Sequence, residues 1–242
     1  MATVADLGSA VNTGTGFTTL TRSVAATTGR LLVVAATVGD AFNSAVVSGV
    51  TWNGNAFTLV EAISGGGSPW ESVSIWMYEV ASGTTANVVA TLDKNLSQGG
   101  STAAITVFEI TGYNISAPAG DTSEQDGTAN NDAETVTTAV DDIVISAIVC
   151  EASSGRWIAP KSGTTEDYNS DPSPGTVSGA WKMGHGSKVA TGISTSIGWD
   201  FLQTGPIPET MNFMHVAAVF QTASAASIVP LLHHTQRLRN LR

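Results

Sequence analysis

The chain has 242 residues, of which 12% are charged, and a formal net charge of -10. This length allows a large buried core, and the charged fraction is about half of the ~25% usual for globular proteins. The acidic balance argues against nucleic acid as a partner, because neutralising phosphates requires clustered Lys and Arg. Cys150 is the single cysteine, so no intramolecular disulfide can form and the fold must depend on its core.

The first residues lack a basic region followed by an apolar segment, so we expect no secretory signal peptide. No apolar run is long enough to span a bilayer, and we expect no membrane partner. We therefore expect synthesis in a cytoplasm, with any extracellular location reached as part of a larger assembly.

Two apolar runs of equal length dominate the pattern, residues 30–38 and residues 142–150. Each is too short for a helix of ordinary length and is rich in β-branched residues, with turn-forming residues around it. Such runs predict strands that are buried on both faces. Because the second run has the same character as the first, we interpret the two as equivalent central strands of a duplicated β-sandwich.

Other predicted strands surround the first run. Residues 1–16 are small and polar and indicate an arm or a loosely held first strand. Residues 17–24 alternate as a half-buried strand does, and residues 46–52 and 56–60 flank Asn53-Gly54, which predicts a hairpin with a type I′ turn. Residues 73–80 alternate clearly, and residues 86–92 and 102–110 complete the first half.

A polar, acidic segment, residues 120–132, is expected to bridge the halves and to form an exposed loop. The second half then repeats the order with a strand around Trp157 and strands in residues 177–189, 194–201 and 211–221. The fold class predicted is all-β, an antiparallel β-sandwich or jelly roll with internally duplicated halves. We expect an arm at 1–16, a sandwich at 17–226 with repeats at about 17–119 and 133–226, and a tail at 227–242.

The predicted tail combines leucines with three arginines and has no acidic residue. A segment this short is marginal as an isolated helix, so we expect it to become ordered only against a partner. The predicted partner-binding residues are Leu231, Leu232, Arg237, Leu238, Arg239, Leu241 and Arg242.

The sequence shows no motif for catalysis or for a cofactor. There is no glycine-rich phosphate loop and no serine in a nucleophile-elbow pattern, so we predict a protein that is not an enzyme. His185 and His215 lack a Cys, His or carboxylate at zinc-ligand spacing, and His233-His234 in the tail is expected to be solvated or to lie in an interface. We therefore predict no cofactor and no metal site.

Two weaker alternatives concern calcium and sugars. Oxygen ligands for calcium occur at Asp121, Glu124, Asp126, Asn130, Asn131 and Asp132, but without the spacing of a dedicated loop, so a solvated loop is expected. Trp70 and Trp157 are the tryptophans expected to be exposed and are candidate glycan contacts. Trp52 and Trp76 lie in alternating strands, where packing in the core is expected.

The sequence also resembles a β-sandwich module of structural proteins in tailed bacteriophages and of bacterial surface proteins. The resemblance covers roughly residues 17–223 and consists of core-packing and turn signatures, so it indicates fold better than role. The motifs that carry it are Leu31-Leu32-Val33-Val34, Val50-Thr51-Trp52-Asn53-Gly54, Phe57-Thr58-Leu59-Val60, Ile75-Trp76-Met77-Tyr78 and Asp141-Asp142-Ile143-Val144-Ile145.

The resemblance implies a virion structural protein with no catalytic residues, most simply a capsid decoration protein or a tail-associated one. Its expected partners are the major capsid protein or another virion protein, and its expected location is the virion. Copies on a symmetric shell fit a homo-oligomer such as a trimer. The alternative function is a tail- or fibre-associated adhesion module that binds glycans.

Overall fold

A computed structural model describes residues 1–40, 44–65, 70–97, 101–151, 156–170, 181–203 and 211–223. Within these ranges every regular element is a β-strand, which confirms the predicted all-β class. The strands of the first half are β1 (Thr3–Thr13), β2 (Thr19–Ala26), β3 (Leu31–Asp40), β4 (Val47–Trp52), β5 (Asn55–Ala56), β6 (Thr58–Ser64), β7 (Trp70–Glu79), β8 (Thr84–Leu92) and β9 (Thr102–Thr111). The strands of the second half are β10 (Ala119–Ala129), β11 (Asn131–Thr137), β12 (Ile143–Glu151), β13 (Arg156–Pro160), β14 (Thr165–Asn169), β15 (Trp181–Val189), β16 (Ser194–Gln203) and β17 (Met211–Phe220).

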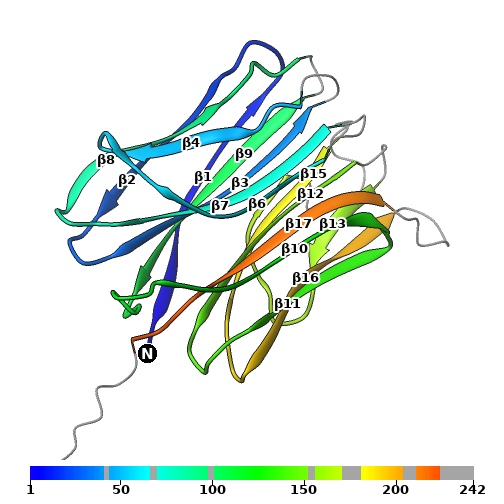
Figure 1. The fold of residues 1–242 in the computed structure, drawn as a ribbon. Coiled ribbons are helices and arrows are strands. Elements are labelled where there is room, and N and C mark those ends of the chain that lie inside the picture. Colours follow the sequence, from blue (N-terminus) through cyan, green and yellow to red (C-terminus); the bar gives the residue numbers. More distant parts are fainter. Residues whose placement is uncertain are drawn as a thin grey trace, which may run out of the picture.

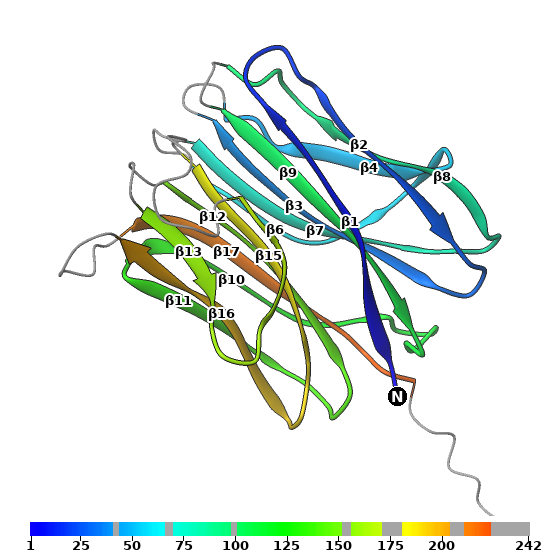
Figure 2. The same cartoon turned by 180° about the vertical axis from the view of Figure 1, so that it is seen from behind.

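These strands form four antiparallel sheets, two in each half. Inner sheet 1 has the order β1-β9-β3-β7-β6, and outer sheet 1 has the order β2-β8-β4-β5. Inner sheet 2 has the order β10-β17-β12-β15-β14, and outer sheet 2 has the order β11-β16-β13. Figures 1 and 2 show the four sheets as successive layers, with the two inner sheets in the middle.

The two halves repeat one topology. In the inner sheets, β1, β9, β3, β7 and β6 occupy the same places as β10, β17, β12, β15 and β14. In the outer sheets, β2, β8 and β4 occupy the same places as β11, β16 and β13. Equivalent strands also follow one another in the same order along the chain. The small strand β5 is the one addition in the first half among the described strands. The structure therefore shows the duplicated sandwich that the two similar apolar runs predict.

The two apolar runs form the central strands β3 and β12, as predicted. Every residue of β3 is buried, because its two faces serve two different cores. Leu32 and Val34 face outer sheet 1, whereas Leu31 and Val33 face the second half. A strand that is covered on both sides needs apolar residues at consecutive positions, which explains the absence of alternation in these runs.

The core between the inner sheets joins the halves into one body. It includes Val33 and Ile75 from inner sheet 1 and Ile145 and Val216 from inner sheet 2, all nearly inaccessible to solvent. Each half therefore covers an apolar face of the other in addition to its own sandwich core, and the apolar area removed from water stabilises the stacked arrangement.

The Asn53-Gly54 hairpin is confirmed. Asn53 and Gly54 have φ values of 49° and 78°, as a type I′ turn requires, and Trp52 pairs with Asn55 across the turn. Trp52 and Trp76 are buried in the core between the sheets of the first half, as the alternation of their strands predicts.

Two segments differ from the simplest expectation. Residues 1–16, expected as an arm or a loosely held first strand, contain β1, which pairs with β9 along its length. Residues 120–132, expected as a bridge and an exposed loop, instead form most of β10 and the start of β11. The loop expectation is wrong because edge strands tolerate polar side chains on their exposed face, so a polar composition does not exclude a strand.

Both ends of the described chain lie at the same end of the molecule (Figures 1 and 2). Tyr113 forms an isolated bridge with Thr222, and the amide of Ala223 donates to the carbonyl of Gly112 at 2.9 Å. A groove of about 640 Å³ lies here, lined by Met1, by the 137–142 turn and by residues 221–223. The predicted tail, residues 227–242, lies outside the described residues.

Candidate functional site

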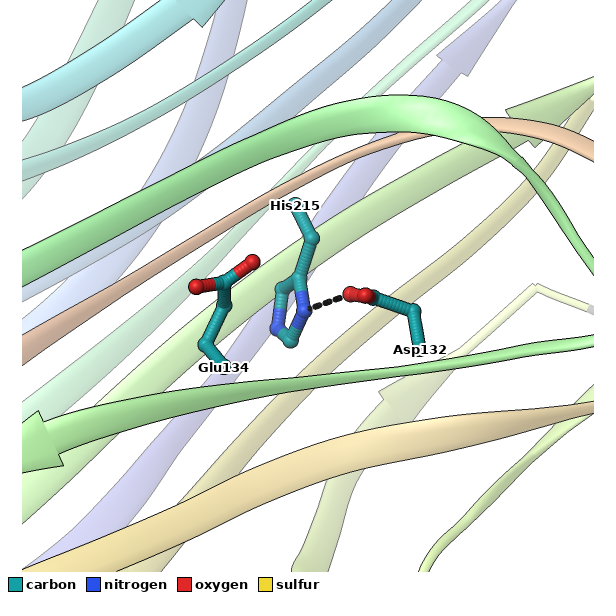
Figure 3. A group of neighbouring side chains, drawn as sticks. All are labelled: Asp132, Glu134 and His215. Carbon is teal, nitrogen blue, oxygen red and sulfur yellow. Dashed lines mark hydrogen bonds and ion pairs between the residues drawn. The ribbon is translucent and has the colours of Figure 1, made fainter.

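The most unusual chemical group in the second half is a buried cluster of two carboxylates and one imidazole. Asp132 and Glu134 extend from β11 in outer sheet 2, and His215 extends from β17 in inner sheet 2. The residues Asp132 and Glu134 are each 4% exposed, and His215 is 0% exposed. Figure 3 shows the His215 ring between the two carboxylates, with Asp132 on one side and Glu134 on the other.

Strand alternation explains why these residues meet. On β11, Asp132 and Glu134 share the buried face with Val136, whereas their chain neighbours are more exposed. On β17, His215 lies between Phe213 and Ala217, which belong to two separate apolar clusters between inner sheet 2 and outer sheet 2. The charged cluster therefore divides the core of the second sandwich into two apolar parts.

Hydrogen bonds fix one side of each acidic group. Asp132 Oδ2 accepts a hydrogen bond from His215 Nδ1, and the pair becomes an ion pair when the ring is protonated. Glu134 Oε2 accepts a hydrogen bond from the Ser123 hydroxyl of β10. Burial raises the pKa of Glu134 above its ordinary value, and the Ser123 hydrogen bond opposes that shift.

The other side of the cluster is left without partners. His215 Nε2 and Glu134 Oε1 are buried and make no hydrogen bond within the described chain. Ser146 on β12 and Trp199 on β16 also have a buried polar atom without a partner, and both lie in the second half. Because buried polar groups are normally paired, His215 Nε2 and Glu134 Oε1 are the atoms of the cluster that remain available to a ligand.

The fold itself does not require a polar group at this place. The pairing of β3 with β9 and of β12 with β17 makes Ile110 of β9 equivalent to Phe220 of β17. By the same alignment, the residue of β9 that is equivalent to His215 is Ile105. Ile105 is a fully buried member of the apolar core in the first sandwich. Among the described residues, the polar cluster is therefore a feature of the second half alone.

A second buried histidine, His185 on β15, has ordinary partners. Its Nδ1 lies 2.7 Å from the Thr106 hydroxyl and its Nε2 lies 3.1 Å from the Thr37 hydroxyl, both across the boundary between the halves. Burial lowers the pKa of His185 to about 3, so the ring is neutral at physiological pH. His185 is a satisfied core residue that links inner sheet 2 to inner sheet 1.

The structure places the sequence-predicted residues in several different regions. Trp157 is half-buried on β13, an edge strand of outer sheet 2. Trp70 is the first residue of β7, and its side chain lies outside what the structure describes. The tail residues Leu231, Leu232, Arg237, Leu238, Arg239, Leu241 and Arg242 also lie outside the described residues.

The calcium alternative is not supported by the geometry. Most of its six residues lie along the exposed edge formed by β10 and the start of β11, and Asp132 alone among them is buried. Among the described residues, the group of three potential ligands that converges is Asp132, Glu134 and His215. Sequence spacing missed this group because Asp132 and His215 are 83 positions apart and meet only when the two sheets stack.

Comparisons with protein-family models, curated proteins and solved structures found no match. Within the described ranges there is no helix of the length and apolar character needed to cross a membrane. The fold is an all-β double sandwich.

Proposed function

We propose that this chain is a non-enzymatic structural protein of a bacteriophage virion, and specifically a capsid decoration protein held to neighbouring subunits through its termini. The observation that carries the proposal is the four-layer body, in which two sandwiches share an apolar core between their inner sheets. Backbone pairing on both sides of β3, β7, β9, β12, β15 and β17 leaves few places for local opening. A rigid body of this kind suits a shell component.

The position of the chain ends supports attachment through the termini. Met1 and Ala223 lie at one end of the stack and line the same groove. The 19 residues after Ala223 therefore start from this end, and they contain the leucines and arginines predicted to bind a partner. In the proposed assembly the partner is the major capsid protein or another virion protein, and the location is the virion after synthesis in the host cytoplasm.

The chemistry of the body supports a structural role over catalysis. The carboxylate–imidazole cluster is almost fully buried, so a substrate cannot contact it without opening the sandwich. The low charged fraction of 12% means that most of the polar exterior comes from uncharged side chains, with a net negative charge of -10. Such copies, placed around symmetry axes of a shell, would form a closed homo-oligomer such as a trimer.

The test is the incorporation of tail variants into particles. Deleting residues 228–242 should abolish incorporation while the body retains its midpoint of thermal unfolding. A matched control replaces the same residues by an equally long Gly-Ser segment, which separates the loss of specific side chains from the loss of length. Incorporation of the deleted or Gly-Ser protein at full occupancy would contradict attachment by the tail.

Two further variants separate the contribution of the tail leucines to incorporation from that of the tail arginines. One changes the four leucines to serine and keeps the arginines, and the other changes the three arginines to glutamine and keeps the leucines. If the partner groove is acidic, the arginine variant should incorporate poorly already at low salt and should depend on salt less steeply than the parent, because salt screens the ion pairs that only the parent makes. If it is apolar, the leucine variant should fail at every salt concentration.

The alternative function is glycan binding during adhesion, and the partial exposure of Trp157 on an edge strand favours it. Its Cα partner on β16 is Leu202, which is 36% exposed, so part of this edge presents apolar surface to solvent. Glycan-array binding that disappears in Trp157→Ala or Trp70→Ala would support adhesion. Absence of binding across a broad array would favour the decoration role.

A further inference from the structure

We propose that His215 Nε2 and Glu134, with Asp132 orienting the His215 ring, form a binding site for one divalent transition-metal ion, with Zn²⁺ as the best-suited class, between inner sheet 2 and outer sheet 2. This inference goes beyond the proposed structural function and replaces the sequence-based prediction of no metal site. It concerns the internal stabilisation of the second sandwich.

The free atoms of the cluster are those of a metal site. Asp132 accepts from His215 Nδ1, which leaves a lone pair on Nε2 when the ring is neutral. Nε2 and Glu134 Oε1 are the atoms without partners, and both are buried. A histidine whose second nitrogen is held by a carboxylate is the usual arrangement at protein metal sites, because the carboxylate fixes the ring and increases its basicity.

The distances fit an ion after small adjustments. One ligand atom from each of the three residues lies within 4.8 Å of the other two. Two ligands of a tetrahedral zinc ion are about 3.4 Å apart, given metal–ligand distances of about 2.0–2.1 Å. Side-chain movements of about 1 Å would bring the His215 and Glu134 ligand atoms to this separation, and water would complete the coordination of the ion. Nitrogen and carboxylate donors together favour zinc and its neighbours over calcium, which prefers oxygen ligands.

A divalent cation would offset the negative charge of the buried carboxylates. Two carboxylates and an imidazole between apolar clusters carry a large desolvation cost, since burial disfavours charge. A divalent cation compensates both carboxylates at once. It would also connect β11 of outer sheet 2 to β17 of inner sheet 2, at the position where the first sandwich uses Ile105 in a continuous apolar core.

The competing occupant is a group of ordered water molecules. Waters could satisfy His215 Nε2, Glu134 Oε1 and the Ser146 hydroxyl with no metal present, because buried water commonly pairs such atoms. The two occupants differ in a measurable way: water binding does not respond to added zinc or to chelators, whereas a metal site does.

The test uses the full chain with His233→Ala and His234→Ala, so that the tail histidines cannot contribute. After dialysis against a chelator, Zn²⁺ is titrated by calorimetry and Co²⁺ by visible absorption, and bound metal is counted by elemental analysis. We expect one ion per chain, an increase in the midpoint of thermal unfolding, and intense cobalt absorption typical of tetrahedral coordination.

Three variants locate the ion. Glu134→Gln should weaken zinc binding at least tenfold while still accepting from Ser123, and Asp132→Asn should weaken it by about 10–100-fold by loosening the His215 ring. Glu109→Gln in β9 of the first half is the matched control and should bind zinc as the parent does. A parent that binds no zinc, or a Glu134→Gln variant that binds it unchanged, would overturn the proposal, and the first outcome would leave water as the occupant.

Discussion

Gly39 of β3 and Trp181 of β15 fit against each other across the boundary between the two halves. A Cβ atom added to Gly39 would lie 2.2 Å from Cδ2 of the indole and 2.3 Å from Cγ. Trp181 is buried in the core between the inner sheets, so its ring cannot move into solvent without exposing that core. The absence of a side chain at Gly39 is therefore a condition for stacking the halves at this distance.

The first prediction is that Gly39→Ala destabilises the protein. Overpacking of a closed core costs about 1–3 kcal/mol, and here it outweighs the usual gain from replacing a strand glycine by alanine. Urea unfolding of both proteins would measure the difference in free energy. The matched control is Gly49→Ala in β4, where an added Cβ has no neighbour within 4 Å. Equal stabilities of the two variants would contradict the packing argument.

The second prediction concerns Glu71, which lies at the same boundary between the halves. Burial, and secondarily the charge of Glu151 on β12, raise the pKa of Glu71 to about 8. Because the folded protein holds this proton more tightly than the unfolded chain, the associated stability is present below pH 4.5 and is lost as pH rises through 8. Glu71→Gln keeps the shape of the side chain but has no proton to lose.

The measurement is the free energy of unfolding in urea at several values between pH 5 and pH 9. The parent should lose stability over this range relative to Glu71→Gln, so the two curves should diverge towards alkaline pH. Asp126→Asn on the exposed part of β10 serves as a control and should follow the parent. Parallel curves for the parent and Glu71→Gln would show that the Glu71 carboxyl does not titrate in this way.

The third prediction concerns His185 and has the opposite sign. Burial lowers the pKa of His185 to about 3, whereas the unfolded chain titrates near 6.5. The unfolded state therefore binds the proton first, and stability is lost as pH falls from about 6.5 towards 3. His185→Gln can still bond the Thr37 and Thr106 hydroxyls but does not titrate. The difference in free energy of unfolding between the parent and His185→Gln, measured in urea, should shrink as the pH is lowered from 7 to 4. A difference that stays constant over this range would contradict the lowered pKa of His185.

Much of the fold could be predicted from the sequence because the signals were local. An apolar run with turn-formers around it predicts a buried strand, and Asn53-Gly54 predicts its turn from backbone geometry alone. The equal length and similar character of the two buried runs predicted the duplication. The polar composition of residues 120–132 predicted a loop where the structure has an edge strand. An edge strand with an exposed face lacks the apolar pattern by which strands are recognised in a sequence.

The buried cluster could not be predicted, because its geometry depends on sheet stacking. The sequence around His215 does not indicate that β11 packs over this side chain. The sequence around Asp132 does not indicate which face of β11 is buried. The alternation Asp132, Glu134, Val136 was a weak signal, since two acidic residues share a face with an apolar one. A spacing rule for metal ligands cannot find residues that two different sheets contribute.

The last prediction concerns Asp142, which fixes the end of the closing strand. Its Oδ1 accepts from the Thr222 amide at 2.8 Å and from the Thr222 hydroxyl at 3.1 Å, and its Oδ2 accepts from the Ala139 amide at 2.7 Å. Asp142 is 4% exposed, so water cannot readily replace these bonds. Asp142→Ala should cost about 1–2 kcal/mol, because the amides of Thr222 and Ala139, which bond it in partly buried positions, lose their acceptor.

Loss of the Asp142 carboxylate should weaken the structure around Thr222, at the end of the described chain, more than it lowers the free energy of unfolding of the whole protein. Hydrogen exchange of the Thr222 amide should accelerate strongly in Asp142→Ala and less in Asp142→Asn, which keeps one carbonyl acceptor. Asp126→Ala on β10 is the control for removing a carboxylate from the surface and should leave this amide protected. Unchanged exchange at Thr222 in Asp142→Ala would mean that the bridge to Tyr113 holds the strand end without the carboxylate.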